Sequence, residues 1–279
     1  MEGDGREDVQ LIAMTHHYAQ LRTGFAVLVT FMVLASSVSP AHENAANNRR
    51  GEVPNPVCIV AFGDSTTAVW SKEIEKAYSQ RLTEALALQS IKAEVINSGI
   101  SGETTADGRA RFDRDVRRHR PDLVIIQFGI NDSWIDADLG KTEPRLTREQ
   151  YRRNLRYMIE TLKGDGAKVI LATPNPMRWS DEYKKMFSVG KPLLDVNDIR
   201  GINRLLDLYA DDVRRIAREE NVRLVDVHKR FEDYGTVRKQ NVSDLLLSDG
   251  IHPNDKGHAL IAGLLMEQIL FLLGVENKR

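Results

Sequence analysis

Three residues of the chain, Ser65, Asp249 and His252, have the side chains that nucleophilic serine chemistry requires. Ser65 stands in segment 63–66 (GDST), directly after an apolar run, but a serine hydroxyl is a poor nucleophile until a neighbouring base takes its proton. Asp249 and His252 are three residues apart, and a carboxylate beside an imidazole holds its tautomer and stabilises the imidazolium. Taken separately, Ser65 could equally cap a helix, and the Asp-His pair could form a surface hydrogen bond.

Two further segments could supply hydrogen-bond donors to a developing oxyanion. Segment 97–102 (NSGISG) contains Gly99, where the missing side chain would let a ligand approach a backbone N–H closely. Segment 129–132 (GIND) contains Asn131, whose side-chain amide can also donate, and Asp132, which we interpret as fixing the geometry of this loop. An ordinary turn at Gly99 and an Asx-turn at Asn131 would explain both segments without chemistry.

The elements that must position these residues follow from the pattern of apolar runs. Short runs, several rich in β-branched residues, predict buried strands at 57–62, 93–96, 123–128, 168–172 and 223–227. Helical spacing of apolar residues predicts helices at 73–88, 151–162, 202–220 and 258–273. This βαβα order predicts an open parallel sheet with helices on both faces. Ligands of such sheets bind beyond the carboxyl ends of the strands, where three of the four polar segments fall.

Together the four segments resemble the SGNH (GDSL-type) hydrolases, a family of serine esterases and lipases, over the whole region from residue 57 onward. The resemblance implies a three-layer α/β/α, flavodoxin-like fold with a five-stranded parallel sheet. It implies a catalytic triad of Ser65, Asp249 and His252. It also implies an oxyanion hole formed by the backbone N–H groups of Ser65 and Gly99 and the side chain of Asn131. No metal and no organic cofactor are expected.

Other hydrolase and nucleotide-binding motifs are missing from the sequence. Thr66 stands where the family name has Leu, a position with no chemical role. The pattern G-x-S-x-G does not surround Ser65, which argues against an α/β-hydrolase. The sequence has no G-x-x-x-x-G-K-[ST] and no H-E-x-x-H, so phosphate-loop and zincin functions have no support.

Composition places the chain among ordinary globular proteins. It has 279 residues, of which 28% are charged and 42% hydrophobic, and a formal net charge of −1. No global field therefore favours nucleic acid or an anionic membrane as a partner. The single cysteine, Cys58, excludes an internal disulfide framework, and its apolar neighbours predict a buried thiol.

The N-terminal region predicts export. Segment 24–35 (GFAVLVTFMVLA) is too short for a comfortable membrane span, follows Arg22 and precedes small residues up to position 41, as in a signal peptide. The alternative is an uncleaved membrane anchor. The segment that precedes it is unusually long for a signal peptide and starts with acidic residues. Initiation at Met14 would give a more ordinary leader. We therefore expect a leader at 1–41, a flexible linker at 42–56 and the hydrolase domain at 57–279, periplasmic or secreted and without stable membrane insertion after cleavage.

Substrate contacts are predicted from residues near the expected active edge. Asp64 adjoins the nucleophile, Trp134 follows the third strand, and Trp179 lies in the long connection 174–198, which could equally pack on itself. His258, six residues beyond His252, is expected to be structural. The expected substrate is a small-molecule or glycan ester, and the expected enzyme a short-acyl esterase such as a carbohydrate O-deacetylase. The alternatives are a longer-acyl lysophospholipase or thioesterase and, from another class, a catalytically silent carbohydrate-binding relative.

Overall fold

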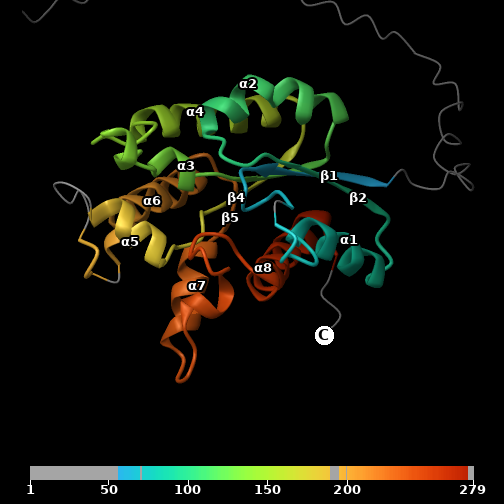
Figure 1. The fold of residues 1–279 in the computed structure, drawn as a ribbon. Coiled ribbons are helices and arrows are strands. Elements are labelled where there is room, and N and C mark those ends of the chain that lie inside the picture. Colours follow the sequence, from blue (N-terminus) through green and yellow to red (C-terminus); the bar gives the residue numbers. More distant parts are fainter. Residues whose placement is uncertain (1–55, 70, 189–194, 199, 276–279) are drawn as a thin grey trace, which may run out of the picture. The chain divides into compact units, whose positions relative to one another are not determined.

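Five strands form one fully parallel sheet in the computed structural model, which describes residues 56–69, 71–188, 195–198 and 200–275 (Figure 1). The strands are β1 (Val57–Gly63), β2 (Ala93–Gly99), β3 (Leu123–Gln127), β4 (Lys168–Ala172) and β5 (Arg223–Val225). Their order across the sheet is β2-β1-β3-β4-β5. Successive strands are thus added on one side of β1 first and then, from β3 onward, on its other side. A flavodoxin-like sheet has the same order, and its ligand site lies at that switch point. The predicted leader and all but the last residue of the predicted linker lie outside the described residues.

Helices cover both faces of the sheet, which confirms the predicted three-layer α/β/α fold (Figure 1). On one face lie α1 (Tyr78–Leu88), α7 (Val227–Thr236) and α8 (Asp255–Leu273). On the other face lie α2 (Thr105–Asp115), α4 (Arg148–Gly164) and α6 (Arg204–Glu219). The short helices are α3 (Ile130–Ser133), α5 (Asp181–Ser188) and the 3₁₀ turns η1 (Arg117–His119), η2 (Ala137–Leu139), η3 (Gly201–Asn203) and η4 (Val242–Leu245).

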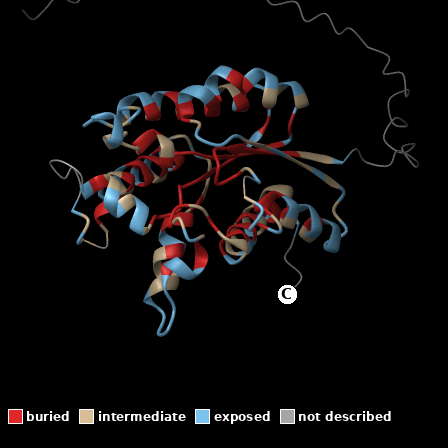
Figure 2. Ribbon diagram, in the orientation of Figure 1, coloured by how far each residue is buried: buried red, intermediate tan, exposed pale blue. Residues whose placement is uncertain are grey.

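The alternation of side chains along β1 explains why its sequence is apolar throughout. Ile59 and Ala61 pack into the core beneath α1 and α8, whereas Val60 and Phe62 pack into the core beneath α2, α4 and α6. All four are fully buried. A strand covered on both faces loses the polar alternation of a half-exposed strand, and burial concentrates along the sheet (Figure 2).

The start of α1 differs from the sequence prediction. The helix was expected from residue 73 but begins at Tyr78, because the backbone N–H groups of Glu75 and Lys76 donate to the carboxylate of Asp255 at 3.0 and 3.1 Å. This contact holds the segment before the helix in an irregular path. The described residues 71–77 therefore precede the first long helix without forming part of it.

Two other features of the core qualify the sequence analysis. Cys58 is only partly buried, not fully buried as predicted. Its burial is the main cause of a raised thiol pKa, and the negative charges of Glu94 and Asp122 raise the pKa further. Helix α8 is the one helix in the described part of the chain that is long and apolar enough to suit a membrane span. Its Ile261 and Leu265 are fully buried in the core, so packing on the sheet accounts for its composition.

Candidate active site

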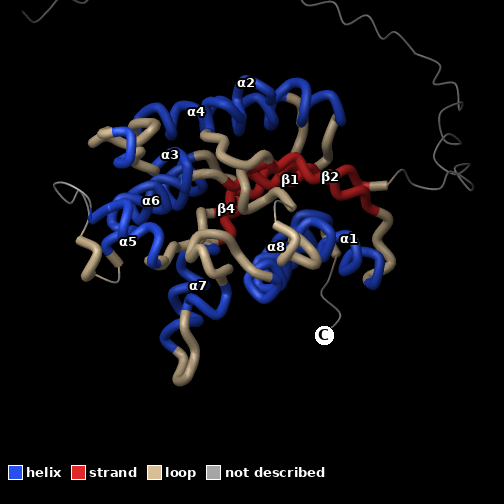
Figure 3. Tube along the Cα trace, viewed as in Figure 1, coloured by secondary structure: helices blue, strands red, loops and turns tan. Residues whose placement is uncertain are grey.

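The structure brings Ser65, His252 and Asp249 together at the carboxyl edge of the sheet. His252 Nε2 lies 2.8 Å from Ser65 Oγ, although the two residues are 187 positions apart, and His252 Nδ1 lies 2.6 Å from Asp249 Oδ2. The Ser65 residue is 7% exposed. The hydroxyl thus touches a base on one side and opens onto a surface cavity on the other. Ser65 lies in the turn after β1, whereas Asp249 and His252 lie in the loop between η4 and α8. Loops and turns cluster at this edge of the sheet (Figure 3).

A tight turn presents Ser65 at the end of β1. The carbonyl of Asp64 accepts hydrogen bonds from the N–H groups of Thr67 and Ala68, both at 3.1 Å. Gly63 makes the turn possible, because a Cβ at that position would lie 2.2 Å from Thr67 Oγ1. The chain therefore reverses within one helical turn and leaves the serine side chain at the edge of the sheet.

Asp64 stabilises this turn from within and does not face the substrate cavity. Its Oδ1 accepts from the N–H and the hydroxyl of Thr66 at 2.9 and 2.8 Å. The residue is 1% exposed, and burial raises the pKa of its carboxyl to about 6. The prediction that Asp64 contacts substrate is therefore wrong, because the side chain is turned inward to hold the loop.

The carboxylate of Asp249 organises the loop that carries His252. One oxygen, Oδ1, accepts from the N–H groups of Ile251 and His252 at 2.7 and 3.0 Å, while Oδ2 contacts the imidazole. Burial alone would raise the pKa of Asp249, but the hydrogen bonds from the imidazole and the two N–H groups outweigh it and hold the pKa below its ordinary value. Asp249 is thus kept ionised beside the histidine at neutral pH.

The segment after β4 holds this loop in place through two hydrogen bonds. Arg178 N–H donates to the carbonyl of Gly250 at 2.7 Å, and the buried Asn175 side chain donates to the carbonyl of Ile251 at 2.8 Å. Gly250 has φ +76°, and a Cβ there would lie 2.2 Å from the carbonyl oxygen of Arg178. The two segments consequently fit together only with glycine at this position.

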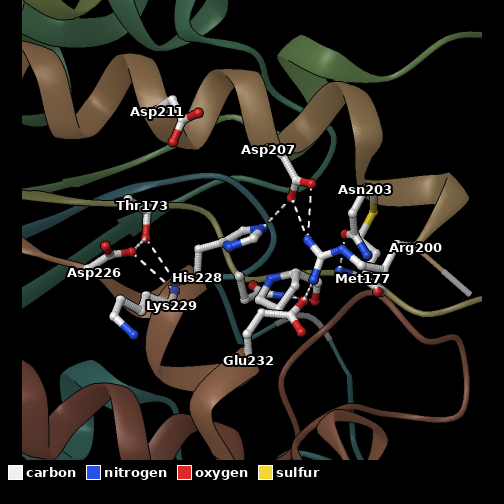
Figure 4. A network of polar contacts seen from close by, with 12 residues as sticks. Thr173, Met177, Arg200, Asn203, Asp207, Asp211, Asp226, His228, Lys229 and Glu232 are labelled. Carbon is white, nitrogen blue, oxygen red and sulfur yellow. Dashed lines mark hydrogen bonds and ion pairs between the residues drawn. The ribbon is translucent and has the colours of Figure 1, made fainter. Parts of the chain in front are cut away.

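A network of charged side chains anchors the bracing segment to α6 and α7 (Figure 4). The guanidinium of Arg178 donates to Glu232 at 3.0 Å, and Arg200 lies 3.0 Å from the same carboxylate. Figure 4 shows Asp207 of α6 between Arg200 and His228, with His228 Nε2 3.0 Å from the Asp207 carboxylate. Sequence reasoning gave no role to this cluster, because its members are scattered over 55 positions of the chain.

Asn131 stands at the start of α3, just beyond β3, and lines the cavity beside Ser65. One N–H of its amide donates to the carbonyl of Glu103 at 3.0 Å, and its Oδ1 accepts from Arg145 at 3.4 Å. These contacts fix which end of the amide is the donor. An amide nitrogen carries two hydrogens, so a second N–H remains to serve a ligand.

Asp132 ties the end of β3 to the start of α2, as expected for a residue that fixes the loop. Its Oδ1 accepts from the N–H and the hydroxyl of Thr105 at 2.9 and 2.5 Å. The residue is fully buried, and that burial raises the pKa of its carboxyl to about 7. Asn154 of α4 donates to the same Thr105 hydroxyl at 3.1 Å, so three elements meet at this point.

The prediction of Gly99 as an oxyanion donor is wrong. Its N–H already donates to Asn97 Oδ1 at 2.9 Å, and a Cβ at Gly99 would lie 2.3 Å from the backbone nitrogen of Ala68. Gly99 therefore packs against the turn that carries Ser65. The next glycine, Gly102, has φ +80° and lines the cavity together with Ser65 and Asn131. Two glycines in one short turn look alike in the sequence, and only the path of the backbone distinguishes them.

A cavity of about 380 Å³ opens beside Ser65. Its apolar wall comes from α3, α5 and the loops, and its rim carries charged side chains. The lining residues are Ser65, Ser101, Gly102, Ile130, Asn131, Trp134, Asp136, Asp138, Arg145, Tyr183, Met186, Ile251 and His252. Trp134, which was predicted to contact substrate, lies in the lining, whereas the sequence analysis missed the charged rim and the side chains of α5. No sequence motif marks them, since they reach the cavity only through the folding of residues 134–146 and 181–188.

Trp179 does not line this cavity, so the prediction that it contacts substrate is wrong. Its indole N–H donates to the carbonyl of Asp198 at 2.8 Å, and its ring packs against Phe187 with centroids 5.7 Å apart. The connection 174–198 therefore packs partly on itself, and it includes α5, which was not expected. Residues 189–194 of that connection lie outside the described residues.

His258 is structural, as expected. It is fully buried, its Nδ1 accepts from the N–H of Tyr78 at 3.3 Å, and burial lowers the pKa of its imidazole to about 4. The part of the chain that the structure describes contains no group of three or more His, Cys, Asp or Glu side chains that could hold a metal ion.

Comparison with known proteins places these features in context. The model of the GDSL-like lipase/acylhydrolase family matches residues 61–260. An uncharacterized lipoprotein of Bacillus subtilis, YqeF, is 30% identical over 76% of this chain and 89% of its own length. An acetylxylan esterase of Geobacillus stearothermophilus is 31% identical over 63% of this chain and 72% of its own. The crystal structure of a lipase/acylhydrolase from Enterococcus faecalis is similar with a TM-score of 0.60 and 25% identity, covering 80% of this chain and 99% of that one.

Proposed function

The chain belongs to the GDSL-like lipase/acylhydrolase (SGNH) family of carboxylic ester hydrolases, and from that premise we propose that Ser65, His252 and Asp249 are its catalytic triad. The observation that carries the proposal is the continuous contact from Ser65 Oγ to His252 Nε2 at 2.8 Å and from His252 Nδ1 to Asp249 at 2.6 Å. A nucleophile, its base and the group that orients the base require this order of contacts, which supports the proposal.

The proposed reaction follows from these contacts. His252 Nε2 takes the proton of Ser65 as Oγ attacks the ester carbonyl, and Asp249 stabilises the resulting imidazolium. The N–H groups of Ser65 and Gly102 and the side chain of Asn131 donate to the oxyanion of the tetrahedral intermediate. The C–O bond to the alcohol then breaks, and the alcohol leaves with the proton from His252. Water, deprotonated by the same imidazole, hydrolyses the acyl-enzyme and regenerates the Ser65 hydroxyl.

Substitution of the nucleophile tests the assignment. Ser65→Ala removes the attacking oxygen and leaves the turn intact, so hydrolysis of p-nitrophenyl acetate should fall to the background rate. Urea unfolding of the variant should match the wild type and show that the fold is retained. Full esterase activity in a folded Ser65→Ala protein would refute the triad.

The preferred substrate is a short-acyl ester of a carbohydrate. The rim of the cavity carries the charged side chains of Asp136, Asp138 and Arg145, and the indole of Trp134 lines the same cavity. Hydrogen-bonding groups beside an aromatic ring suit the hydroxyl groups and the apolar face of a sugar. The similarity to an acetylxylan esterase supports the same class of substrate. The expected partners are therefore ester substrates of glycan or small-molecule type, with no role for nucleic acid.

A longer-acyl lysophospholipase or thioesterase is the second candidate, because part of the same cavity is apolar. Ile130, Tyr183, Met186 and Ile251 form a wall on which an alkyl chain could pack. Comparison of kcat/KM for p-nitrophenyl acetate and p-nitrophenyl octanoate separates the two. A strong preference for octanoate would eliminate the deacetylase. Release of acetate from acetylated polysaccharides by the wild type but not by Ser65→Ala would establish the carbohydrate O-deacetylase activity.

A catalytically silent carbohydrate-binding protein is the alternative from another class. The close contact of Ser65 with His252 argues against it, because an inactive relative does not need an activated hydroxyl. Reaction with a fluorophosphonate probe checks this directly, since labelling requires a nucleophilic serine. Labelling of the wild type but not of Ser65→Ala is the expected result, and failure to label the wild type would favour the silent protein.

We also propose that the protein is exported. The apolar segment 24–35 with its small-residue flank supports a leader, and the similarity to a protein described as a lipoprotein is compatible with export. Cell fractionation with mass measurement of the mature N-terminus distinguishes cleavage near residue 41 from an uncleaved membrane tether. It also distinguishes initiation at Met1 from initiation at Met14 when the leader is retained.

A further inference from the structure

A second cavity, of about 470 Å³, adjoins the one that contains Ser65. It is lined by Asp136, Gly140, Lys141, Thr142, Glu143, Pro144 and Arg145, and two of these residues, Asp136 and Arg145, also line the first cavity. We propose that this second cavity binds the sugar units next to the acetylated one, so that the enzyme acts best on O-acetylated oligosaccharides. The inference rests on the proposed carbohydrate esterase function.

The loop that forms the second cavity has a defined shape. Its two ends are joined by hydrogen bonds from Arg145 N–H to the carbonyl of Trp134 at 2.9 Å and from Leu146 N–H to the carbonyl of Asp132 at 3.1 Å. Within it, the turn η2 ends at Gly140, which has φ +71°. The loop is thus closed at its base, and the position of the cavity relative to Asn131 and Ser65 is fixed by the strand that precedes it.

The ion pair between Asp136 and Arg145 forms the boundary between the two cavities. Arg145 Nη2 donates to Asp136 Oδ1 at 2.6 Å, and its Nε donates to Oδ2 at 3.0 Å, which is the two-bond geometry of a strong pair. A further nitrogen of Arg145 lies 3.4 Å from Asn131 Oδ1. A molecule that spans from Ser65 into the second cavity must therefore pass over this planar pair.

The chemistry of the second cavity differs from that of the first. Its side chains are nearly all hydrogen-bonding groups, with two positive charges from Lys141 and Arg145 and two negative charges from Asp136 and Glu143. An alkyl chain would desolvate these groups without replacing their hydrogen bonds, which is unfavourable. An anionic group would meet the two carboxylates, and Asp136 already neutralises Arg145. A neutral chain of hydroxyl groups both donates and accepts, and so can satisfy donors and acceptors of both signs.

The test compares acetylated substrates of increasing length on the full-length enzyme. Substrates are p-nitrophenyl acetate, an O-acetylated xylose and an O-acetylated xylotetraose, and acetate release gives kcat/KM for each. The test variant is Lys141→Ala/Glu143→Ala, which removes two polar side chains of the second cavity. The control is Lys92→Ala/Glu94→Ala, an exposed pair of the same types at the amino end of β2.

The wild type should hydrolyse the tetraose about tenfold better than the single sugar, the gain expected from one or two net hydrogen bonds. Lys141→Ala/Glu143→Ala should lose most of this gain and retain the wild-type kcat/KM on p-nitrophenyl acetate, whereas the control variant should retain both. Equal rates on the single sugar and the tetraose in the wild type would overturn the second cavity as a sugar site while leaving the carbohydrate esterase intact. Activity on p-nitrophenyl acetate without activity on either sugar would overturn the carbohydrate substrate, and the inference with it.

Discussion

Alanine in place of Gly250 should separate two effects: the positioning of the loop that carries Asp249 and His252, the proposed catalytic loop, and general stability. Gly250 lies between Asp249 and the His252 segment, has φ +76°, and places its Cα so that a Cβ would lie 2.2 Å from the carbonyl oxygen of Arg178. Real Cβ atoms essentially never approach within 3.0 Å, so the loop must move by about 0.8 Å or more. Because Arg178 is held by Glu232, most of this movement should fall on the catalytic loop.

The expected effect on turnover is large. A displacement of about 1 Å in a catalytic group costs on the order of 10²-fold in rate, since the reacting atoms no longer meet in line. The contact between His252 and Asp249 should lengthen, while the cavity wall formed by α5 stays in place. We therefore expect kcat for p-nitrophenyl acetate to fall about a hundredfold with little change in KM. Backbone strain should also lower the free energy of unfolding by about 1–3 kcal/mol.

Gly166 offers a matched control for the strain alone. It has φ +84° in the turn between α4 and β4, and a Cβ there would meet no atom within 4 Å. Gly166→Ala should therefore lower stability by a similar strain term of about 1–2 kcal/mol and leave kcat unchanged. Steady-state kinetics and urea unfolding of both variants provide the comparison. If Gly250→Ala retained the kcat of Gly166→Ala, the bracing of the catalytic loop by the β4 segment would be refuted.

Three further predictions concern side chains around the same site. Asn131→Ala should lower kcat by about 10²–10³-fold in steady-state assays, because the proposed oxyanion donor is lost, and an effect confined to KM would contradict that role. Asn175→Ala should lower kcat more than KM by releasing the Ile251 carbonyl, and Asn175→Gln should not restore it, since the longer side chain cannot donate from the same place. Burial raises the folded-state pKa of Asp132 to about 7, above the ordinary value of about 3.9, so ionisation destabilises the fold progressively as pH rises from about 4 to 7. Asp132→Asn retains the acceptor for Thr105 but does not titrate. In urea unfolding between pH 4 and 8, the free energy of unfolding of the variant should therefore rise relative to that of the wild type as pH increases. The same pH dependence of this free energy in both proteins would contradict the burial argument.

Strands β1, β3 and β4 were the most predictable part of the fold, because burial on both faces gives a continuous apolar run. Every expected strand is present within a few residues of its predicted bounds. Helix α2 gave no comparable signal, since its buried face consists of Thr105, Gly108, Arg111 and Phe112 and shows no apolar period. The start of α1 was misplaced because Asp255, far away in the sequence, binds the backbone before the helix. Long-range contacts of this kind leave no trace in local propensity.

In the site, the sequence could identify types of residues but not the direction of each group. The sequence predicted Gly99 as a donor, and the hydrogen bond from the Gly99 N–H to Asn97 excludes it. Gly102, which lines the cavity, was not considered. Trp134 and Trp179 were equally plausible as aromatic contacts, and the bond from the Trp179 indole to the backbone at Asp198 excludes the second. In both cases an internal partner, invisible in the sequence, had already satisfied the polar group.

The aspartates of the site show how environment assigns roles to identical side chains. Asp64 and Asp132 each bind a threonine hydroxyl and a backbone N–H from a fully buried position, and burial raises the pKa of both carboxyls. Asp249 is only partly buried and accepts hydrogen bonds from an imidazole and two backbone N–H groups, which holds its pKa down. Stabilising an imidazolium requires a carboxylate that stays charged while His252 gains its proton. Asp249 meets that condition by its local hydrogen bonds, whereas the other two are placed to hold the turns on which Ser65 and Asn131 stand.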